Sequence, residues 1–145
     1  SYAIDVNLLL YASDAASPHH RRAEAFLKRC AAGDEVMCLA WPTIMGYLRI
    51  STHPAIFSAP LSPEEAMQNI EALLSLPQVR VLSEDDDFWA AYRKATGGMV
   101  VRGNLVPDAH IAAVLLAHGI TTFYTNDVDF WKFGFLEVRN PLQES

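Results

Sequence analysis

The stretch GITTFYTNDVDF, residues 119–130, decides the fold that the sequence predicts. Its first half, Ile120 to Tyr124, is rich in β-branched and aromatic residues, as is typical of a buried strand. Two carboxylates, Asp127 and Asp129, follow directly, and the aromatic pair Phe130–Trp131 comes after them. A strand that opens onto two carboxylates indicates a functional site at its carboxyl end. We expect the aromatic pair to attach the next segment to the core.

Strand-like and helix-like segments alternate along the rest of the chain. The helices are indicated by apolar residues at helical spacing and by start and stop signals such as the capping box Ser62-x-x-Glu65 and the stop at Gly119. Helices are expected at residues 7–12, from 17–18 to 33, from 41–42 to 53–54, from 62 onward, at 85–96 and from Pro107 to Gly119. Strands are expected at residues 2–6, 35–40, 79–82 and 120–124, with a weaker signal at 136–138.

Alternation of strands and helices predicts an α/β fold with three layers, in which a central, mostly parallel sheet carries helices on both faces. At 145 residues the chain has the size of one domain, and no Gly/Ser-rich or Pro-rich linker divides it. We therefore expect a single domain over residues 1–145. In sheets of this kind the functional site lies beyond the carboxyl ends of the strands, where the strand order reverses.

Composition and charge limit the classes of function. The formal net charge is −6, from 11 basic and 17 acidic residues, and this balance disfavours non-specific binding to duplex nucleic acid. It does not exclude nucleic acid as a substrate, because carboxylates that hold a divalent cation count as acidic when the cation is left out. No apolar run approaches the ~20 residues that cross a bilayer, and the first residues lack the layout of a signal peptide. We expect a cytoplasmic protein with no membrane contact.

Three carboxylates from distant parts of the chain stand where this architecture builds sites. Asp5 ends the first strand, Asp127 follows the strand 120–124, and Asp108 lies in the first turn of a helix after the loop GNLVP. Each alone could be an ordinary helix cap or turn residue. Together they predict a site in which neighbouring carboxylates raise one another's pKa unless a cation or a shared proton is present.

The chemistry of these side chains favours a hard cation. Carboxylate oxygens without Cys or His alongside favour Mg²⁺ or Mn²⁺ over Zn²⁺. With one or two such ions, metal-activated water attacks a phosphodiester while the ions stabilise the attacking and leaving oxygens. Asp5, Asp108 and Asp127 are therefore the candidate catalytic and metal-binding residues.

Other polar residues could assist this cluster. Asp129 either binds the metal or caps a turn, and Asn7 either orients Asp5 or caps the helix that follows it. Thr125 offers a hydroxyl near the metal, although a turn role explains it equally well. Arg49 is the best placed basic residue for a contact with the phosphate of a substrate.

The sequence also resembles a known family. The segments AIDVNLLLYA (3–12), GNLVPDAHIAA (103–113) and TNDVDF (125–130) are similar in kind, order and spacing to the PIN domain family, and most of all to the VapC-type toxins of bacterial toxin-antitoxin modules. The resemblance extends through WPTIMGYLRISTHPAIF (41–57) to the closing NPL (140–142). It implies an Mg²⁺- or Mn²⁺-dependent endoribonuclease. It also implies Asp5, Asp108 and Asp127 as the acidic cluster, Asp129 as an occasional further ligand, a small VapB-type antitoxin as partner, and a homodimer.

One position departs from the family pattern and keeps two other hypotheses open. Gly46 stands where the family commonly has a glutamate, a few residues before Arg49, which suggests close packing or a need for room there. A degenerate domain that binds RNA or a protein partner without cleaving is the alternative that Gly46 motivates. A receiver-type phosphoryl-transfer domain ranks last, because it requires a lysine near the acidic cluster, and neither Lys94 nor Lys132 is expected to be well placed.

Overall fold

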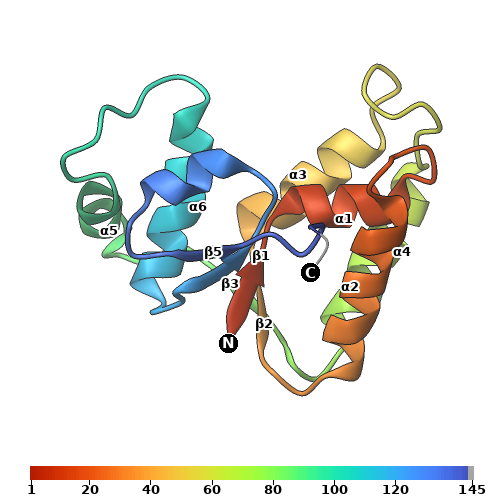
Figure 1. The fold of residues 1–145 in the computed structure, drawn as a ribbon, viewed down its shortest axis with the longest axis horizontal. Helices are drawn as coiled ribbons and strands as arrows, with labels where there is room; N and C mark the ends of the chain where they lie inside the picture. Colours follow the sequence, from red (N-terminus) through yellow and green to blue (C-terminus); the bar gives the residue numbers. More distant parts are fainter. Residues whose placement is uncertain (144–145) are drawn as a thin grey trace.

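The computed structural model describes residues 1–143 and contains one five-stranded sheet in the order β3-β2-β1-β4-β5 (Figure 1). Every neighbouring pair of strands is parallel. The strands are β1 (Tyr2–Ile4), β2 (Met37–Ala40), β3 (Val79–Leu82), β4 (Thr122–Tyr124) and β5 (Glu137–Arg139). All carboxyl ends therefore lie at one edge of the sheet.

Helices cover both faces of this sheet, as the sequence predicts. In Figure 1 the first four helices lie on one side and the other two lie on the opposite side, together with a short 3-10 helix, η1. The first group is α1 (Val6–Ser13), α2 (His20–Ala32), α3 (Trp41–Ser51) and α4 (Pro63–Leu74). The second group is α5 (Phe88–Ala95), α6 (Leu105–Ala117) and η1 (Val128–Lys132). The predicted three-layer α/β fold is confirmed.

The alternation of side chains along the strands explains why two cores form. Successive residues of a strand point to opposite faces. Tyr2 and Ile4 of β1 accordingly join the core under the first group of helices, whereas Ala3 joins the core under α6 and η1. Because both faces are covered, the central strands are apolar throughout, and all four residues of β2 are buried.

Three helix starts differ from the sequence-based prediction. The structure begins α2 at His20 with His19 as the N-cap, so the predicted start at Ser17–Pro18 is wrong and these two residues lie in the preceding turn. The structure begins α6 at Leu105, two residues before Pro107, because the first N–H groups of a helix have no partner within it and proline loses nothing in the first turn. It begins α5 at Phe88, so the acidic residues 85–87 precede the helix. All three differences fall at helix ends, where short-range signals locate a boundary only to within a few residues.

The strand order reverses between β1 and β4, which makes their carboxyl ends the topological switch point. β1 pairs with β2 on one side and with β4 on the other. The chain leaves β1 towards the α1 to α4 side, and α6 leads into β4 from the opposite side. Connections that depart to opposite faces leave a crevice between them, and such crevices are where α/β proteins place their sites. Asp5 follows β1 and Asp127 follows β4, so both lie at this crevice.

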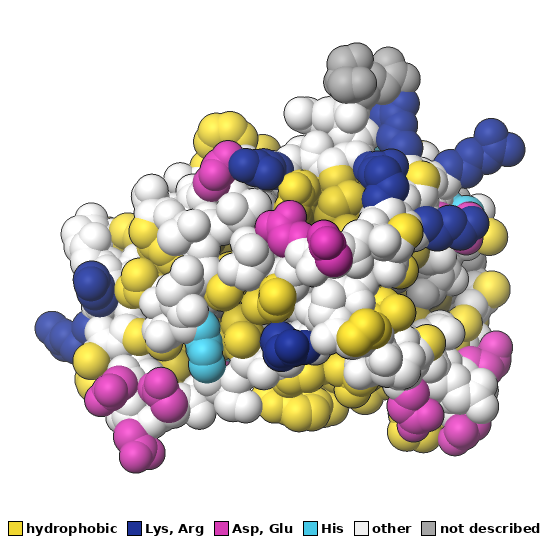
Figure 2. All heavy atoms as spheres, turned by 90° about the horizontal axis from the view of Figure 1, so that it is seen from below, with side chains coloured by type: hydrophobic (Ala, Val, Ile, Leu, Met, Phe, Trp, Pro, Cys, Tyr) yellow, Lys and Arg dark blue, Asp and Glu magenta, His cyan; other side chains and the backbone are white. Residues whose placement is uncertain are grey.

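The opposite edge of the sheet has a mixed surface. Figure 2 views the molecule from the side where the strands begin, and basic, acidic and hydrophobic side chains of the described residues are interspersed there. Neither acidic nor basic side chains alone cover the surface seen in Figure 2. Within residues 1–143, no helix combines the length and the apolar run that crossing a membrane requires.

The predicted capping box of α4 is formed, and it supplies a test of the fold. Ser62 Oγ accepts from the Glu65 amide at 3.1 Å, and Glu65 Oε1 accepts from the Ser62 amide at 3.1 Å. We expect Ser62→Ala to lower the free energy of unfolding by about 1 kcal/mol, because it leaves amides of the first turn without an acceptor. Urea unfolding would measure this. The exposed Ser58 lies in the preceding loop, so Ser58→Ala is the control, and equal effects of the two substitutions would contradict the prediction.

Candidate metal centre

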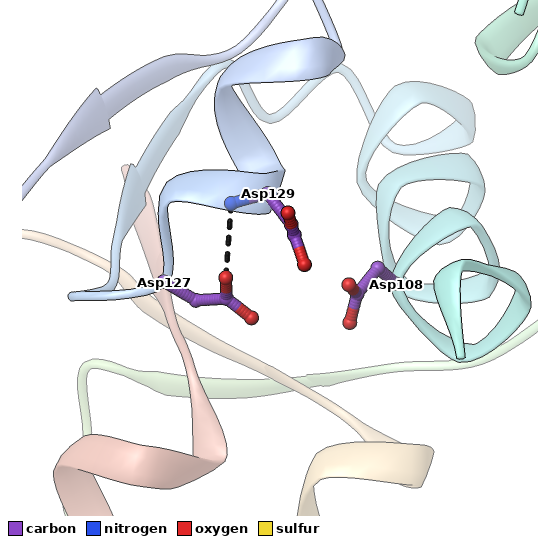
Figure 3. A group of neighbouring side chains, drawn as sticks. All are labelled: Asp108, Asp127 and Asp129. Carbon is purple, nitrogen blue, oxygen red and sulfur yellow. Dashed lines mark hydrogen bonds between the residues drawn. The ribbon is translucent and has the colours of Figure 1, made fainter.

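Three carboxylates converge between η1 and the start of α6. Each of Asp108, Asp127 and Asp129 offers an oxygen within 4.8 Å of those of the other two, and Figure 3 shows all three side chains directed into the same space. Asp108 lies in the first turn of α6, Asp127 is the N-cap of η1, and Asp129 lies within η1. Asp127 Oδ1 accepts from the Asp129 amide at 2.9 Å, which holds these two side chains in register. We call these three residues the acidic trio.

Asp5 is joined to the trio through Thr125. The Thr125 hydroxyl donates to Asp5 Oδ2 at 2.6 Å and accepts from the Asp127 amide at 2.9 Å. Asp5 is 9% exposed and Thr125 is 1% exposed, so this connection is shielded from water. Asp5 occupies the N-cap position of α1 but makes no capping hydrogen bond. Its carboxylate instead ties the end of β1 to the end of β4.

The electrostatics of the site show carboxylates crowded without enough counter-charge. Burial, followed by the charges of Asp127, Asp5 and Asp129, raises the pKa of Asp108 to about 6. Burial also raises the pKa of Asp5, and the charge of Asp127 adds to this, while the hydrogen bond from Thr125 opposes it. These shifts have the direction expected of carboxylates that repel one another.

A divalent cation fits this set of donors. The three oxygens come from carboxylates, which are hard ligands, and no sulfur or imidazole belongs to the group. Burial, and then the charges of the neighbouring carboxylates, raises the pKa of Asp108, and a bound cation would offset those charges. Among the described residues, the acidic trio is therefore the set that could hold such an ion, and Asp5 is joined to it through Thr125.

Lys132 was not expected near the cluster, and the structure corrects this. Its Nζ lies 3.5 Å from Asp129 Oδ1, and its charge lowers the pKa of Asp108. Asp129 and Lys132 are three residues apart in η1, and one turn of a 3-10 helix has three residues, so their side chains share a face. The spacing could have indicated this contact once a 3-10 turn was expected.

The two aromatic residues after Asp129, Phe130 and Trp131, lie in different environments. Phe130 is 2% exposed and packs between Phe123 and Phe133, which confirms its predicted role in the core. Trp131 is 71% exposed, so the expectation that it fastens this segment to the core is wrong. Neighbouring residues of a short helix point in different directions, and only one of the pair can face the sheet.

Asn7 and Arg49 lie outside the trio. Asn7 is partly buried in α1, and no hydrogen bond joins its side chain to Asp5 within residues 1–143. Arg49 is exposed in the last turn of α3, whereas the carboxyl edge of the sheet lies where α3 begins. Among the described residues Arg49 forms no ion pair with the trio. Contact of either residue with a substrate stays a prediction.

Gly46 is not explained by close packing. A Cβ placed at this position would lie 3.7 Å from Val6 Cγ2, which is an ordinary van der Waals contact. The interpretation that a neighbouring atom excludes a side chain here is therefore wrong. Space remains at Gly46 on the side of α3 that faces the start of α1.

Comparison with known proteins identifies the family. The model of the PIN domain matches residues 2–136, so the chain belongs to the PIN domain family. Ribonuclease VapC48 of Mycobacterium tuberculosis is 44% identical over 142 residues, which span 98% of each chain. Ribonuclease VapC43 of the same species is 34% identical over 139 residues, covering 96% of this chain and 94% of that protein. The resemblance seen in the sequence is confirmed.

Solved structures of the same type have this fold. VapC20 of M. tuberculosis, described as a toxin that cleaves the sarcin-ricin loop, superposes with a TM-score of 0.68 at 22% identity and covers 96% of this chain and 99% of its own. VapBC2 of Rickettsia felis, solved bound to a promoter DNA fragment, gives a TM-score of 0.68 at 17% identity, with 96% and 97% covered. At these identities the likeness concerns the fold alone.

The Thr125 hydroxyl supplies the first test of the site. We expect Thr125→Val to lower the free energy of unfolding by about 1–3 kcal/mol, because the buried Asp5 carboxylate and the Asp127 amide both lose their partner. Thr125→Ser keeps the hydroxyl and is the matched control, with a smaller loss. Chemical denaturation of both variants measures the difference. A valine variant as stable as the serine variant would contradict the role given to this hydroxyl.

The raised pKa of Asp108 supplies a second test. A carboxyl whose pKa is raised on folding contributes stability below its unfolded pKa and loses that contribution as the pH rises through about 6. In the presence of chelator at pH 8, we therefore expect Asp108→Asn to melt roughly 2–4 °C above the wild type, a modest shift because Asp108 is partly exposed. The difference should shrink towards pH 4. Thermal melts of both proteins, with the exposed Asp86→Asn as control, measure it, and a less stable variant at pH 8 would contradict the assignment.

Proposed function

We propose that this chain is a metal-dependent endoribonuclease toxin of a toxin-antitoxin system, and that residues 1–145 act as one PIN domain. Asp5, Asp108 and Asp127 are the catalytic and metal-binding residues, with Asp129 as a further ligand. The observation that carries the proposal is the convergence of Asp108, Asp127 and Asp129 within 4.8 Å at the β1/β4 switch point. The similarity to ribonucleases VapC48 and VapC43, at 44% and 34% identity over nearly the whole chain, supports the same activity.

The residues of the chain have distinct tasks in this proposal. A bound Mg²⁺ or Mn²⁺ supplies charge stabilisation at the phosphodiester and lowers the pKa of the attacking water. Asp5, Asp108, Asp127 and Asp129 would hold the ion with carboxylate oxygens. Asp5 and Thr125 fix the direction of the Asp127 segment through two hydrogen bonds. Because its pKa is about 6, Asp108 must lose a proton before it can bind a cation, so metal affinity should fall as the pH drops below 6.

RNA with an accessible single strand is the proposed substrate. Single-stranded loops leave unstacked bases accessible to side chains, whereas the major groove of an RNA duplex is too deep and narrow for side chains to read. The chain has a net charge of −6, a balance that disfavours non-specific binding to a duplex. We propose that a short accessible segment of RNA enters at the acidic trio, with Asn7 and Arg49 as further candidates for substrate contact.

The proposed partner is a cognate VapB-type antitoxin, and the proposed assembly is a cytoplasmic homodimer. Solved neighbours of the fold include VapBC2 of R. felis and VapBC of Salmonella typhimurium, both bound to DNA. A groove of about 450 Å³ between the first four helices, lined by apolar side chains such as Leu9, Leu27, Ile70 and Leu73, offers a partner protein an apolar surface.

Cleavage of total bacterial RNA by purified, antitoxin-free protein tests the activity. We expect defined fragments with Mg²⁺ or Mn²⁺ and none with chelator. Asp127→Asn should reduce the rate at least about 100-fold, because even residues that merely support a ligand cost 10–100-fold when changed. Asp86→Asn, in an exposed acidic run, should cleave like the wild type.

Failure of this experiment would favour the non-cleaving alternative. If folded wild-type protein binds the cation but cuts no RNA, the chain is better explained as a PIN domain that binds RNA or a partner without cleavage. Gly46→Glu would then be the informative substitution, because a Cβ added at this position would meet no steric clash. Cleavage that persists in Asp127→Asn would instead show that the acidic trio is the wrong site.

A further inference from the structure

A second cavity lies beside the end of η1. It has a volume of about 230 Å³ and is formed by the end of α5, the loop after it, the end of α6 and the segment after η1. Its lining includes the apolar side chains of Met99, Leu116 and Phe135 and two cationic side chains, Lys94 and Lys132. The cavity therefore combines an apolar floor with ammonium groups.

The charge of this cavity contrasts with the rest of the molecule. The chain has a net charge of −6 and only three lysines, and two of them line this one cavity. Among the described residues that line the cavity there is no carboxylate. Lys94 is exposed and forms no ion pair within residues 1–143. Such a cavity attracts an anion with an apolar part.

The cavity is coupled to the acidic trio by Lys132. The ammonium of Lys132 lies 3.5 Å from Asp129 Oδ1, so one side chain contacts the candidate metal centre and also lines the cavity. Figure 3 shows Asp129 projecting from η1 into the trio, and η1 ends at Lys132. A polymer anchored at the trio would reach the cavity within a short length of chain.

We propose that this cavity is a subsite for a nucleotide flanking the cleaved bond of a single-stranded RNA, with Lys94 and Lys132 holding its phosphate. This inference rests on the proposed ribonuclease function. It adds residues that bind the substrate next to the cleaved bond. Met99, Leu116 and Phe135 contact the base or the sugar. Single-strand binding sites join cationic groups that follow the backbone with apolar surfaces that receive the bases, and this cavity has both.

Charge favours RNA over a protein segment as the occupant. An RNA strand carries a phosphate at every nucleotide, and neutralising it releases counterions, which drives binding. A protein segment would need an acidic side chain placed beside an apolar one to match the same cavity. The proximity of the cavity to the trio also gives RNA a reason to be there, because a strand bound at the trio continues past Lys132.

The salt dependence of RNA binding tests the subsite. The probe is a fluorescein-labelled single-stranded RNA of 20 random nucleotides, measured by anisotropy with Mg²⁺ in an Asp127→Asn background at several KCl concentrations. For single strands the slope of log K against log salt is about −0.7 for each phosphate contact. We expect Lys94→Gln and Lys132→Gln each to reduce the slope by roughly 0.7, and the double variant by roughly 1.4.

Lys28 provides the matched control. It is the third lysine, it pairs with Glu24 at 3.6 Å much as Lys132 pairs with Asp129, and it lies on α2, away from the cavity. Lys28→Gln should keep the unsubstituted slope. Lys94→Arg should restore most of the slope that Lys94→Gln loses, because the positive charge returns.

Four results would overturn the inference in distinguishable ways. If the wild type cleaves RNA but both glutamine variants keep the full slope, the cavity is not an RNA subsite, although the proposed function stands. If Lys132→Gln changes only the affinity for Mn²⁺, measured by calorimetry, Lys132 serves the acidic trio instead. If the variants weaken only the complex with the cognate antitoxin, the lysines serve a protein contact instead. If the wild type neither binds nor cleaves RNA, the proposed function fails and the subsite fails with it.

Discussion

The hydrogen bonds that run from Asp5 through Thr125 to Asp127 are the interaction on which the rest of the site depends. They join the ends of β1 and β4, two strands that are adjacent in the sheet but separated by most of the chain. Because Asp5 and Thr125 are shielded from water, the geometry of the Thr125 hydroxyl determines where the Asp127 segment leaves the sheet. The turn into η1 follows from this, since Asp127 then accepts the amide of Asp129.

The same arrangement has an electrostatic cost that the fold only partly offsets. Three carboxylates share a small space, burial and repulsion raise the pKa of Asp108, and a single ammonium, that of Lys132, lies beside Asp129. Sites that are prepared for a cation often cost stability in its absence, because the binding geometry is held by packing elsewhere. Here the two apolar cores on either side of the sheet supply that packing.

Much of the fold could be predicted because its signals are local. Periodic apolar residues, the capping box at Ser62 and the strand before Thr125 each act over a few neighbours, and they predicted the layers correctly. The helix starts at Leu105 and Phe88 were less predictable, since several residues can begin a helix at similar cost. The role of Gly46 could not be read from the sequence, because it depends on the distance to Val6 in another helix.

The sequence by itself determined that carboxylates stand after β1, after β4 and in the first turn of α6, because strand ends and helix starts follow from local patterns. Only the tertiary structure decided how these side chains meet. Asp129 faces Asp108 and Asp127, Asp5 reaches them through Thr125, and Lys132 turns towards Asp129 while Trp131 points to solvent. These directions depend on how η1 packs against α6 and the sheet, and contacts between segments distant in sequence leave no periodic signal in either one.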